Sequence, residues 1–357
     1  MKGDAKGVLL ISSGGLGDTV LFCHVVGRFA SLAKSGELVT VLLRSDSIKM
    51  SFLLPPEISL FSVDFKRLRI DMSYRRKITH SLFEANYRLV VHTDFLRHPD
   101  LDEALCKATH SQEIVAMEPR SWKKYDSRLN ANRAIYGRLF DSGPEVQDKM
   151  LRWSSFAEWL IGSKSVFPPV FIGSSQLIPA LKTKDPVVII QPFSAVKRKQ
   201  VPAEHYEFII NRLIPKTRII ITGAQDDFEK NIEYKTLLDI PRVEYDSSSF
   251  EDLVPLLRAA DLVLSVDTAL MHLAVAVGAP TICIASAAYV GEIVPYDDSL
   301  TPKNVRFVFN PMDCQGCLGN CIHTEIKGMF PCIALHESER LLSVLSDFAP
   351  QLVREEK

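Results

Sequence analysis

The stretch DLVLSVDTALMHLAVAVGAP, residues 261–280, contains an apolar strand, a sharp turn and a helix. Asp267 and Thr268 are residue types that cap a helix N-terminus, and the closing Gly-Ala-Pro ends the helix. A helix that begins at the carboxyl end of a parallel strand presents free N–H groups and a positive dipole end, which suit a phosphate. His272 lies about one turn into this helix, where it can face the same site. An ordinary capped strand–helix–strand unit has the same pattern, so the motif alone leaves both interpretations open.

A second turn of this kind lies near the N-terminus, where the strand 7–13 is followed by GGLGD at residues 14–18. Glycines such as Gly15 and Gly17 between a strand and a helix let a ligand approach the backbone closely. The spacing matches neither the dinucleotide fingerprint nor a P-loop. Asp18 is the carboxylate that the turn presents, either as a reactive group or simply as the helix cap. Two such turns, one in each half, predict two nucleotide-type domains facing one cleft.

Length and composition fit two domains of an ordinary globular protein. The chain has 357 residues, more than one core normally spans, and 46% of them are hydrophobic and 24% charged. No apolar run is long enough to cross a membrane, and the first residues lack the apolar segment of a signal peptide. We therefore expect a cytoplasmic protein.

Strands and helices alternate along the chain, which predicts α/β domains with parallel sheets covered by helices. The expected domains are residues 1–165 and 186–340, both Rossmann-like, joined by a linker at 166–185 and followed by a C-terminal helix and tail at 341–357. The expected strands lie at 8–13, 38–44, 58–63, 88–93, 113–117, 187–192, 218–222, 243–245, 262–266, 281–285 and 305–309. The helices expected in the second half lie at 202–213, 227–238, 250–260 and 268–277, with a last helix at 335–348.

Charge is distributed unevenly between the halves, although the formal net charge is only −1. Residues 1–150 contain 22 Lys and Arg against 18 Asp and Glu, and the rest of the chain contains 20 against 25. The basic excess is concentrated at 66–77 and recurs more loosely at 120–138. Such clusters favour an anionic partner or peripheral contact with a membrane, and a solvated basic face is the alternative. No nucleic-acid-binding motif accompanies them, so no nucleic-acid partner is expected.

Two further strand-to-helix turns in the second half carry polar side chains. Ser194 follows the strand 187–192 and leads into the basic run 197–199, a loop that can clamp a diphosphate. The turn that begins at Gly223 presents Gln225, whose carboxamide can bond a ribose hydroxyl or a base. A charged surface loop is the alternative for the basic run 197–199.

With these turns in order, the chain resembles glycosyltransferase family 9, the ADP-heptose heptosyltransferases. The resemblance rests on four motifs that span most of the chain, namely Gly15–Asp18, Lys199–Pro202, Gly223–Gln225 and Asp267–His272. It implies the GT-B fold, in which two Rossmann-like domains with parallel sheets face a central cleft. The N-terminal domain would bind the acceptor and the C-terminal domain the nucleotide sugar. It also implies inversion at the anomeric carbon without a catalytic metal.

The resemblance further implies roles for single residues. Asp18 matches the family's carboxylate base and Lys199 matches the lysine that contacts the donor phosphate. In such a mechanism Asp18 takes the proton of the acceptor hydroxyl, and Lys199 with the helix N-terminus stabilises the leaving diphosphate. The residues that match the motif holding the diphosphate, and its histidine, are Asp267, Thr268, Ala269 and His272.

Three positions depart from the family pattern. Val201 stands where the family usually has Trp, Ala269 where it usually has Gly, and Gln225 where lipopolysaccharide heptosyltransferases carry a ribose-binding Glu. The last difference leaves the identity of the donor sugar nucleotide more open than the type of reaction. The acceptor is either lipid A core, a surface protein or a small molecule. The alternative functions are a non-catalytic GT-B scaffold or binding protein and, less favoured, a nucleotide-sugar epimerase. The presence of Asp18, Lys199 and His272 together favours the transferase.

Seven cysteines are present, and four of them cluster in the loop 314–332 as C-x2-C-x3-C-x10-C. In a cytoplasmic chain four such thiols indicate a structural metal rather than disulfides. Zinc fits four thiolates by default, and an iron–sulfur cluster is another option. Iron is a third, because the resembling autotransporter heptosyltransferases carry it on four cysteines at a different spacing. Free or disulfide-bonded cysteines are the alternative to a metal. The expected ligands are Cys314, Cys317, Cys321 and Cys332.

Overall fold

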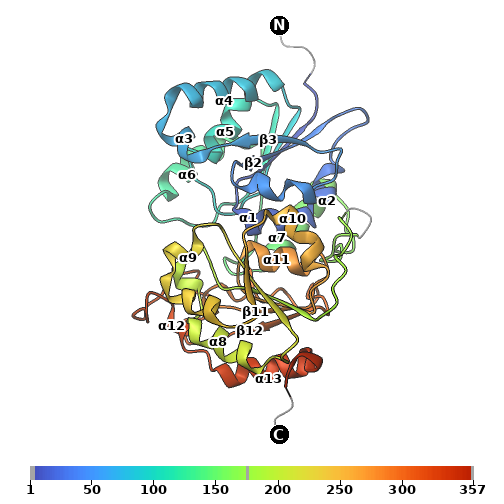
Figure 1. Ribbon diagram of the computed structural model, residues 1–357. Coiled ribbons are helices and arrows are strands. Elements are labelled where there is room, and N and C mark those ends of the chain that lie inside the picture. Colours follow the sequence, from blue (N-terminus) through green and yellow to red (C-terminus); the bar gives the residue numbers. More distant parts are fainter. Residues whose placement is uncertain (1–4, 174–176, 355–357) are drawn as a thin grey trace. The chain divides into compact units, whose positions relative to one another are not determined.

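The computed structural model describes residues 5–173 and 177–354, and it divides the chain into two compact units, Met1–Pro168 and Pro169–Lys357. Residues 174–176 of the predicted linker and 355–357 of the predicted tail lie outside the described residues. Each unit contains a six-stranded parallel sheet covered by helices (Figure 1), which confirms the α/β prediction. Within the described ranges, no helix combines the length and the apolar character needed to cross a membrane.

The first unit has the strand order β3-β2-β1-β4-β5-β6, and every neighbouring pair is parallel. β1 lies inside the sheet and all five of its residues are buried, as in a strand with both faces covered. The strands are β1 Val8–Ser12, β2 Val39–Arg44, β3 Ser59–Val63, β4 Leu89–His92, β5 Glu113–Met117 and β6 Arg138–Phe140. The helices are α1 Leu16–Cys23, α2 Val26–Ala30, α3 Phe65–Ile70, α4 Met72–Ala85, α5 Asp102–Thr109, α6 Asp126–Asn132 and α7 Lys149–Ile161.

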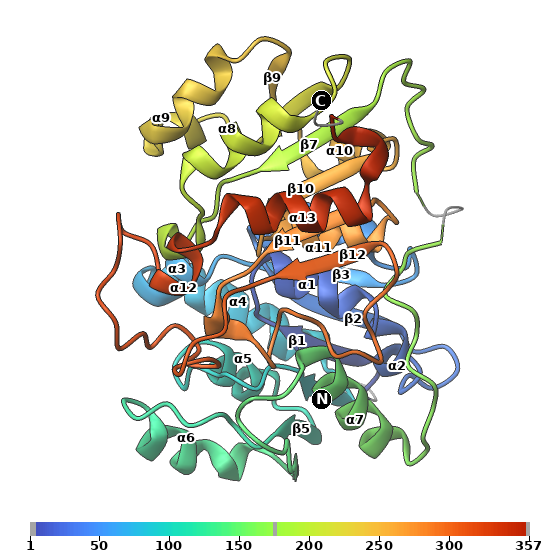
Figure 2. The ribbon, with the colours of Figure 1, turned by 90° about the horizontal axis from the view of Figure 1, so that it is seen from below.

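The second unit repeats this plan with the order β12-β11-β10-β7-β8-β9, again all parallel. Helices α8 and α13 pack side by side, as Figure 2 shows. The strands are β7 Val187–Gln191, β8 Arg218–Thr222, β9 Val243–Asp246, β10 Leu262–Val266, β11 Thr281–Ile284 and β12 Val305–Val308. The helices are α8 Ala203–Arg212, α9 Asp227–Lys230, α10 Phe250–Leu257, α11 Ala269–Ala276, α12 Pro331–Ala334 and α13 Ser338–Phe348.

All eleven predicted strands are confirmed, but three details of the prediction are wrong. β6 is missed, because its three residues are only half-buried or exposed and carry no apolar run. The helix predicted over 227–238 stops at Lys230 and a separate 3-10 helix, Ile232–Asp239, follows. The last helix begins at Ser338 rather than at 335. Asn231 separates α9 from the 3-10 helix Ile232–Asp239, because its backbone leaves the helical region at φ −134° and ψ 67°.

His336, in the short connection between α12 and α13, is a buried histidine with few polar partners. Its side chain is 4% exposed, and its Nε2 lies 3.4 Å from the carbonyl oxygen of Ala285. Its Nδ1 has no hydrogen-bond partner among the described residues. Burial disfavours the imidazolium and lowers the pKa of His336 to about 4.

We expect acidification to destabilise the second unit through His336. The unfolded imidazole takes up a proton near pH 6.5, whereas the folded one stays neutral until about pH 4, so stability is lost as the pH falls between these values. The loss between pH 7.5 and 4 should reach about 3 kcal/mol. Urea unfolding at several pH values checks this. His336→Gln should remove that part of the pH dependence, whereas the exposed control His80→Gln should keep it.

Candidate functional site

The Gly-rich turn of the first unit folds Asp18 back onto the backbone that precedes it. Gly15 caps α1 in an extended conformation, and its N–H donates to Asp18 Oδ2 at 2.9 Å. The cap function considered for Asp18 is therefore real. A Cβ added at Gly14 would lie 2.6 Å from the Asp18 Cβ, so a side chain at Gly14 would displace the carboxylate. The sequence draws attention to Gly15 and Gly17 instead, and a Cβ at Gly15 would meet nothing closer than 3.8 Å.

Lys149 is a residue of this site that the sequence does not predict. Its Nζ lies 2.5 Å from Asp18 Oδ1, and about a quarter of each side chain is exposed. Lys149 opens α7 directly after Asp148, whose carboxylate accepts the N–H groups of the next turn, and its ammonium lies 5.7 Å from the Trp153 ring centre. At 2.5 Å from Asp18 Oδ1, the Lys149 ammonium is close enough for a charge-assisted hydrogen bond to the carboxylate. Asp18 is thus held by a backbone amide on one oxygen and by a cation on the other.

A buried polar cluster supports the same turn from the neighbouring strand β4. The N–H and Oγ of Ser13 both donate to Asp94 Oδ2, at 2.6 and 2.7 Å. Asp102 Oδ2 lies 3.2 Å from Ser13 Oγ and 3.6 Å from His92 Nε2. Burial raises the pKa of Asp94, and the hydrogen bonds from Ser13 oppose this rise only in part. Ser13, His92 and Asp94 lie at the ends of two strands and Asp102 begins α5, so no local sequence pattern brings these groups together.

In the second unit, Lys199 and Asp267 form a buried ion pair. Lys199 lies in a 3-10 turn, Lys197–Lys199, after β7, and its ammonium contacts the Asp267 carboxylate directly after β10. Side-chain exposure is 15% for Lys199 and 3% for Asp267. Burial by itself opposes both charges, but their mutual attraction lowers the pKa of Asp267 and raises the pKa of Lys199. The Lys199 ammonium also lies 4.8 Å from the ring centre of Tyr289.

His272 extends this pair into a buried network. Its Nε2 is 3.5 Å from Asp267 Oδ1, and its Nδ1 is 2.6 Å from the hydroxyl of Tyr296. His272 therefore contacts Asp267 directly in the folded unit. The imidazole is only 3% exposed, however, because both ring nitrogens face protein partners.

Thr268 provides the N-cap of α11, and Ala269 is the first helical residue. The Thr268 hydroxyl accepts the N–H of Met271, so Thr268 rather than Asp267 caps the helix. Since β10 ends inside a parallel sheet, the first N–H groups of α11 lie at its carboxyl edge, where nucleotides bind in folds of this class.

The other predicted donor residues lie on loops after neighbouring strands of the same edge. Ser194 accepts the N–H of Val196 at 3.2 Å. A Cβ at Gly223 would lie 2.6 Å from the Phe193 ring, so only glycine lets this turn pack there. Gln225 is exposed, and no hydrogen bond of its side chain is found within the described part of the chain. Lys199 and His272 therefore both contact Asp267 directly. The other predicted donor residues share only their position at the carboxyl edge of the sheet.

Three of the four clustered cysteines lie in an irregular loop that is tied to the 3-10 turn Ala287–Tyr289, and the fourth, Cys332, lies in α12. Backbone bonds join Gly316 N to Ala287 O at 3.0 Å and Leu318 N to Ala288 O at 2.8 Å. All four thiols are free, and in the described part of the chain no three or more ligating side chains are arranged to hold a metal ion. Burial raises the pKa of Cys314, and the neighbouring thiols of Cys317 and Cys321 raise it further. These three sulfurs therefore lie within electrostatic reach of one another.

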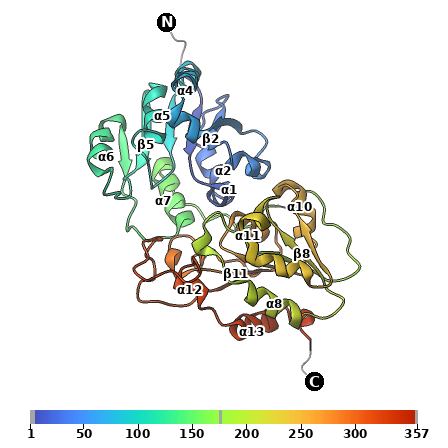
Figure 3. The ribbon, with the colours of Figure 1, turned by 60° about the vertical axis from the view of Figure 1, so that its left-hand side comes forward.

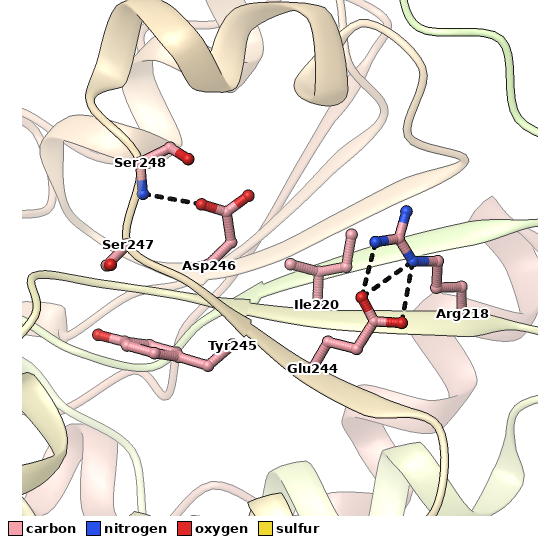
Figure 4. Close-up of a pocket in the computed structure, with 7 residues that line it drawn as sticks. All are labelled: Arg218, Ile220, Glu244, Tyr245, Asp246, Ser247 and Ser248. Atoms are coloured by element: carbon pink, nitrogen blue, oxygen red, sulfur yellow. Dashed lines mark hydrogen bonds and ion pairs between the residues drawn. The ribbon is translucent and has the colours of Figure 1, made fainter.

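A shallow pocket of about 430 Å³ lies on the open face of β8 and β9 (Figure 4). Arg218 pairs with Glu244 there, and Asp246 accepts the N–H of Ser248 at 2.7 Å. Its charged groups are therefore largely satisfied by one another. None of the predicted donor residues lines this pocket.

Comparison with known proteins agrees with this geometry. Residues 167–318 match the model of glycosyltransferase family 9 (heptosyltransferase). A 123-residue segment is 34% identical to an Escherichia coli K12 protein provisionally named lipopolysaccharide heptosyltransferase 4, and it covers 33% of this chain and 29% of that relative. The match thus spans less than a third of the relative's length.

Solved structures share the fold over nearly the whole chain. Escherichia coli heptosyltransferase WaaC with ADP superposes with a TM-score of 0.69 at 17% identity, covering 96% of this chain and 99% of that one. The iron-containing dodecameric glycosyltransferase TibC from enterotoxigenic E. coli superposes with a TM-score of 0.55 at 16% identity, covering 98% and 77%. Residues 167–318 are therefore similar to glycosyltransferase family 9, and the chain shares the GT-B fold of the heptosyltransferase structures.

Proposed function

We propose that this protein is an inverting glycosyltransferase that moves a heptose or a related sugar from a nucleoside diphosphate sugar to an acceptor hydroxyl without a catalytic metal. ADP-heptose is the first candidate donor, and a lipopolysaccharide core is the first candidate acceptor. The observation that carries this proposal is the buried Lys199–Asp267–His272 network beside the N-terminus of α11, within the residues that match family 9. The ADP bound to the structurally similar WaaC supports an adenine nucleotide.

The second unit supplies what a leaving diphosphate needs. A Lys ammonium has three N–H donors, and Asp267 occupies only one side of it, so Lys199 retains donors for a phosphate oxygen. The first turn of α11 adds free N–H groups and the positive end of the helix dipole. Asp267 fixes the ammonium in place before the donor binds, and such preorganisation is the main source of electrostatic catalysis.

The first unit supplies the base. As the acceptor oxygen bonds to the anomeric carbon, the bond from that carbon to the diphosphate breaks, and the acceptor proton passes to Asp18. Attack from the side opposite to the diphosphate inverts the configuration. Lys149, whose ammonium pairs with the Asp18 carboxylate, holds it in one orientation until the proton arrives.

A thermal-shift screen of nucleoside diphosphates and their sugars tests this function. A ligand that binds only the folded chain raises its melting temperature, and ADP or ADP-heptose should do so at concentrations where UDP and GDP do not. Product analysis with the stabilising sugar then separates the alternatives. A scaffold binds the nucleotide and consumes no sugar donor, whereas an epimerase changes the sugar without an acceptor. If no nucleotide stabilises the chain, the proposal is wrong.

We further propose that Cys314, Cys317, Cys321 and Cys332 hold one structural zinc or iron ion. The loop between them has little regular structure, and its thiols lie near one another. Burial raises the pKa of Cys332, and the backbone hydrogen bonds from Ala287 and Ala288 oppose this rise only in part. The iron in the structurally similar TibC adds support for iron. The described loop would have to close around the ion, because its cysteines do not yet form a ligand set.

Purified without chelator, the chain is expected to contain close to one metal atom. Thiolate ligation supplies folding energy to a loop of this kind, so Cys317→Ser should lower both the metal content and the melting temperature of the second unit. Cys23→Ala, which removes a thiol outside the cluster, should leave the metal content unchanged. Elemental analysis gives the content and separates zinc from iron. A metal-free protein in which all four thiols react with a thiol reagent would disprove the site.

A further inference from the structure

Helices α3 and α4 meet at a corner of the first unit where apolar and basic side chains are exposed together. Figures 1 and 3 show α4 on the outside of this unit. Ile70 ends α3 and is 71% exposed, and Met72 begins α4 and is 63% exposed. The buried side of the two helices is provided by Leu68, Ile78 and Leu82. We call the exposed set the α3–α4 corner, and it consists of Lys66, Arg69, Ile70, Met72, Arg76 and Lys77.

Four cations at this corner lack anionic partners. The segment 64–85 has six Lys and Arg against three Asp and Glu. Arg67 pairs with Asp71, and Arg75 donates to a backbone carbonyl. In the described parts of the chain, no ion pair or hydrogen bond is found for the side chains of the remaining cations, which are Lys66, Arg69, Arg76 and Lys77.

The second basic stretch, 120–138, is different. There the arginines are paired with carboxylates, which neutralise part of the positive charge of that stretch. The pairs are Arg120–Glu145, Arg128–Asp100, Arg133–Glu118 and Arg138–Glu113. Lys123 and Lys124 of that stretch have no ion pair among the described residues, whereas the α3–α4 corner combines four unpaired cations with exposed apolar side chains.

We propose that the α3–α4 corner docks the protein on an anionic lipid bilayer. Unpaired Lys and Arg side chains are attracted to anionic headgroups, and exposed aliphatic side chains among them insert at the boundary with the acyl chains. Single-stranded nucleic acid is favoured by free aromatic rings, but the Tyr74 ring is already covered by the Arg67 guanidinium at 4.3 Å. This inference does not depend on the sugar transfer, because it concerns a surface formed by other residues.

Vesicle co-sedimentation of the full chain, without nucleotide, tests the docking. The wild-type chain should sediment with vesicles containing phosphatidylglycerol and stay in solution with phosphatidylcholine alone. Higher salt should weaken the binding. Arg76→Glu with Lys77→Glu should lower the partition coefficient about tenfold or more, and Ile70→Ser with Met72→Ser should lower it several-fold.

Two matched double variants serve as controls. Lys182→Glu with Lys184→Glu changes the same charge at exposed positions elsewhere, and Leu38→Ser with Val166→Ser removes exposed apolar side chains elsewhere. Both should bind vesicles like the wild type, and melting temperatures confirm folding of all four. Equal binding to the two kinds of vesicle, or unchanged binding of both corner variants, overturns the proposal. Binding to a duplex oligonucleotide but to no vesicle would assign the corner to nucleic acid and overturn it as well.

Discussion

Replacing Asp18 by Asn is expected to slow sugar transfer by roughly 10²-fold or more, because a carboxamide cannot accept the acceptor proton. The Asn oxygen can still accept the N–H of Gly15, so the Gly-rich turn should keep its shape. The charge that pairs with Lys149 is lost as well. Single-turnover kinetics with the donor identified by the thermal-shift screen measure the effect. Titration calorimetry should give an unchanged affinity for the nucleoside diphosphate, since the donor residues lie in the second unit.

Asp46→Asn is the matched control for this prediction. Asp46 is a half-exposed carboxylate of the first unit that pairs with Arg44 on the surface. Its loss should leave the transfer rate within about twofold of the wild-type rate, as for a surface pair of little energetic weight. Near-normal turnover of the Asp18→Asn chain would show that another group takes the proton.

Lys199→Ala is expected to weaken nucleoside diphosphate binding by at least about tenfold and to destabilise the second unit. The variant leaves the Asp267 carboxylate, 3% exposed, without the cation that balances it. Removing one partner of a buried ion pair typically costs about 3–5 kcal/mol in the free energy of unfolding. Titration calorimetry gives the affinity for the nucleoside diphosphate. Urea unfolding followed by circular dichroism gives the free energy of unfolding. Lys230→Ala, which breaks an exposed pair with Asp226, should change neither quantity appreciably.

The double variant Lys199→Ala with Asp267→Asn separates the two effects. It removes the unbalanced charge and should recover much of the lost stability, because a neutral side chain is cheaper to bury than an ion. If Lys199 contacts the diphosphate directly, the nucleotide affinity stays low in the double variant. Recovery of the affinity together with the stability would mean that Lys199 acts only by compensating Asp267.

The strands and the main turns were predictable because their signals are local. β1 and β10 are apolar runs of parallel-sheet length, each followed at once by residues that form turns and helix caps. The helix predicted over 227–238 failed for a tertiary reason. Asn231 bonds back to the carbonyl of Asp227 and also receives the ammonium of Lys197 from another loop, so its backbone leaves the helix.

Some residues of the site can likewise be recognised from nearby sequence, whereas others are placed there only by contacts between distant parts of the chain. Asp18 and Lys199 could be named from the sequence because each follows a strand, Asp18 in the first turn of α1 and Lys199 in the loop after β7, at the edge where parallel sheets bind ligands. Lys149 could not, because 131 residues separate it from Asp18 and only the packing of α7 brings it there. Gly14 is similar, since its need for glycine depends on where the Asp18 side chain folds.

The sequence by itself determined the residue types at the strand ends: a carboxylate after β1, a lysine after β7, and the Asp-Thr cap after β10. Only the tertiary structure decided that Lys199 and Asp267 meet. β8 and β9 lie between their strands along the chain, yet β7 and β10 are neighbours in the sheet. The physical reason is that strand order follows from how apolar strands and helices bury one another as a whole, and no local pattern records that choice. The charge compensation of Lys199, and its buried link to His272, therefore exist only in the folded unit.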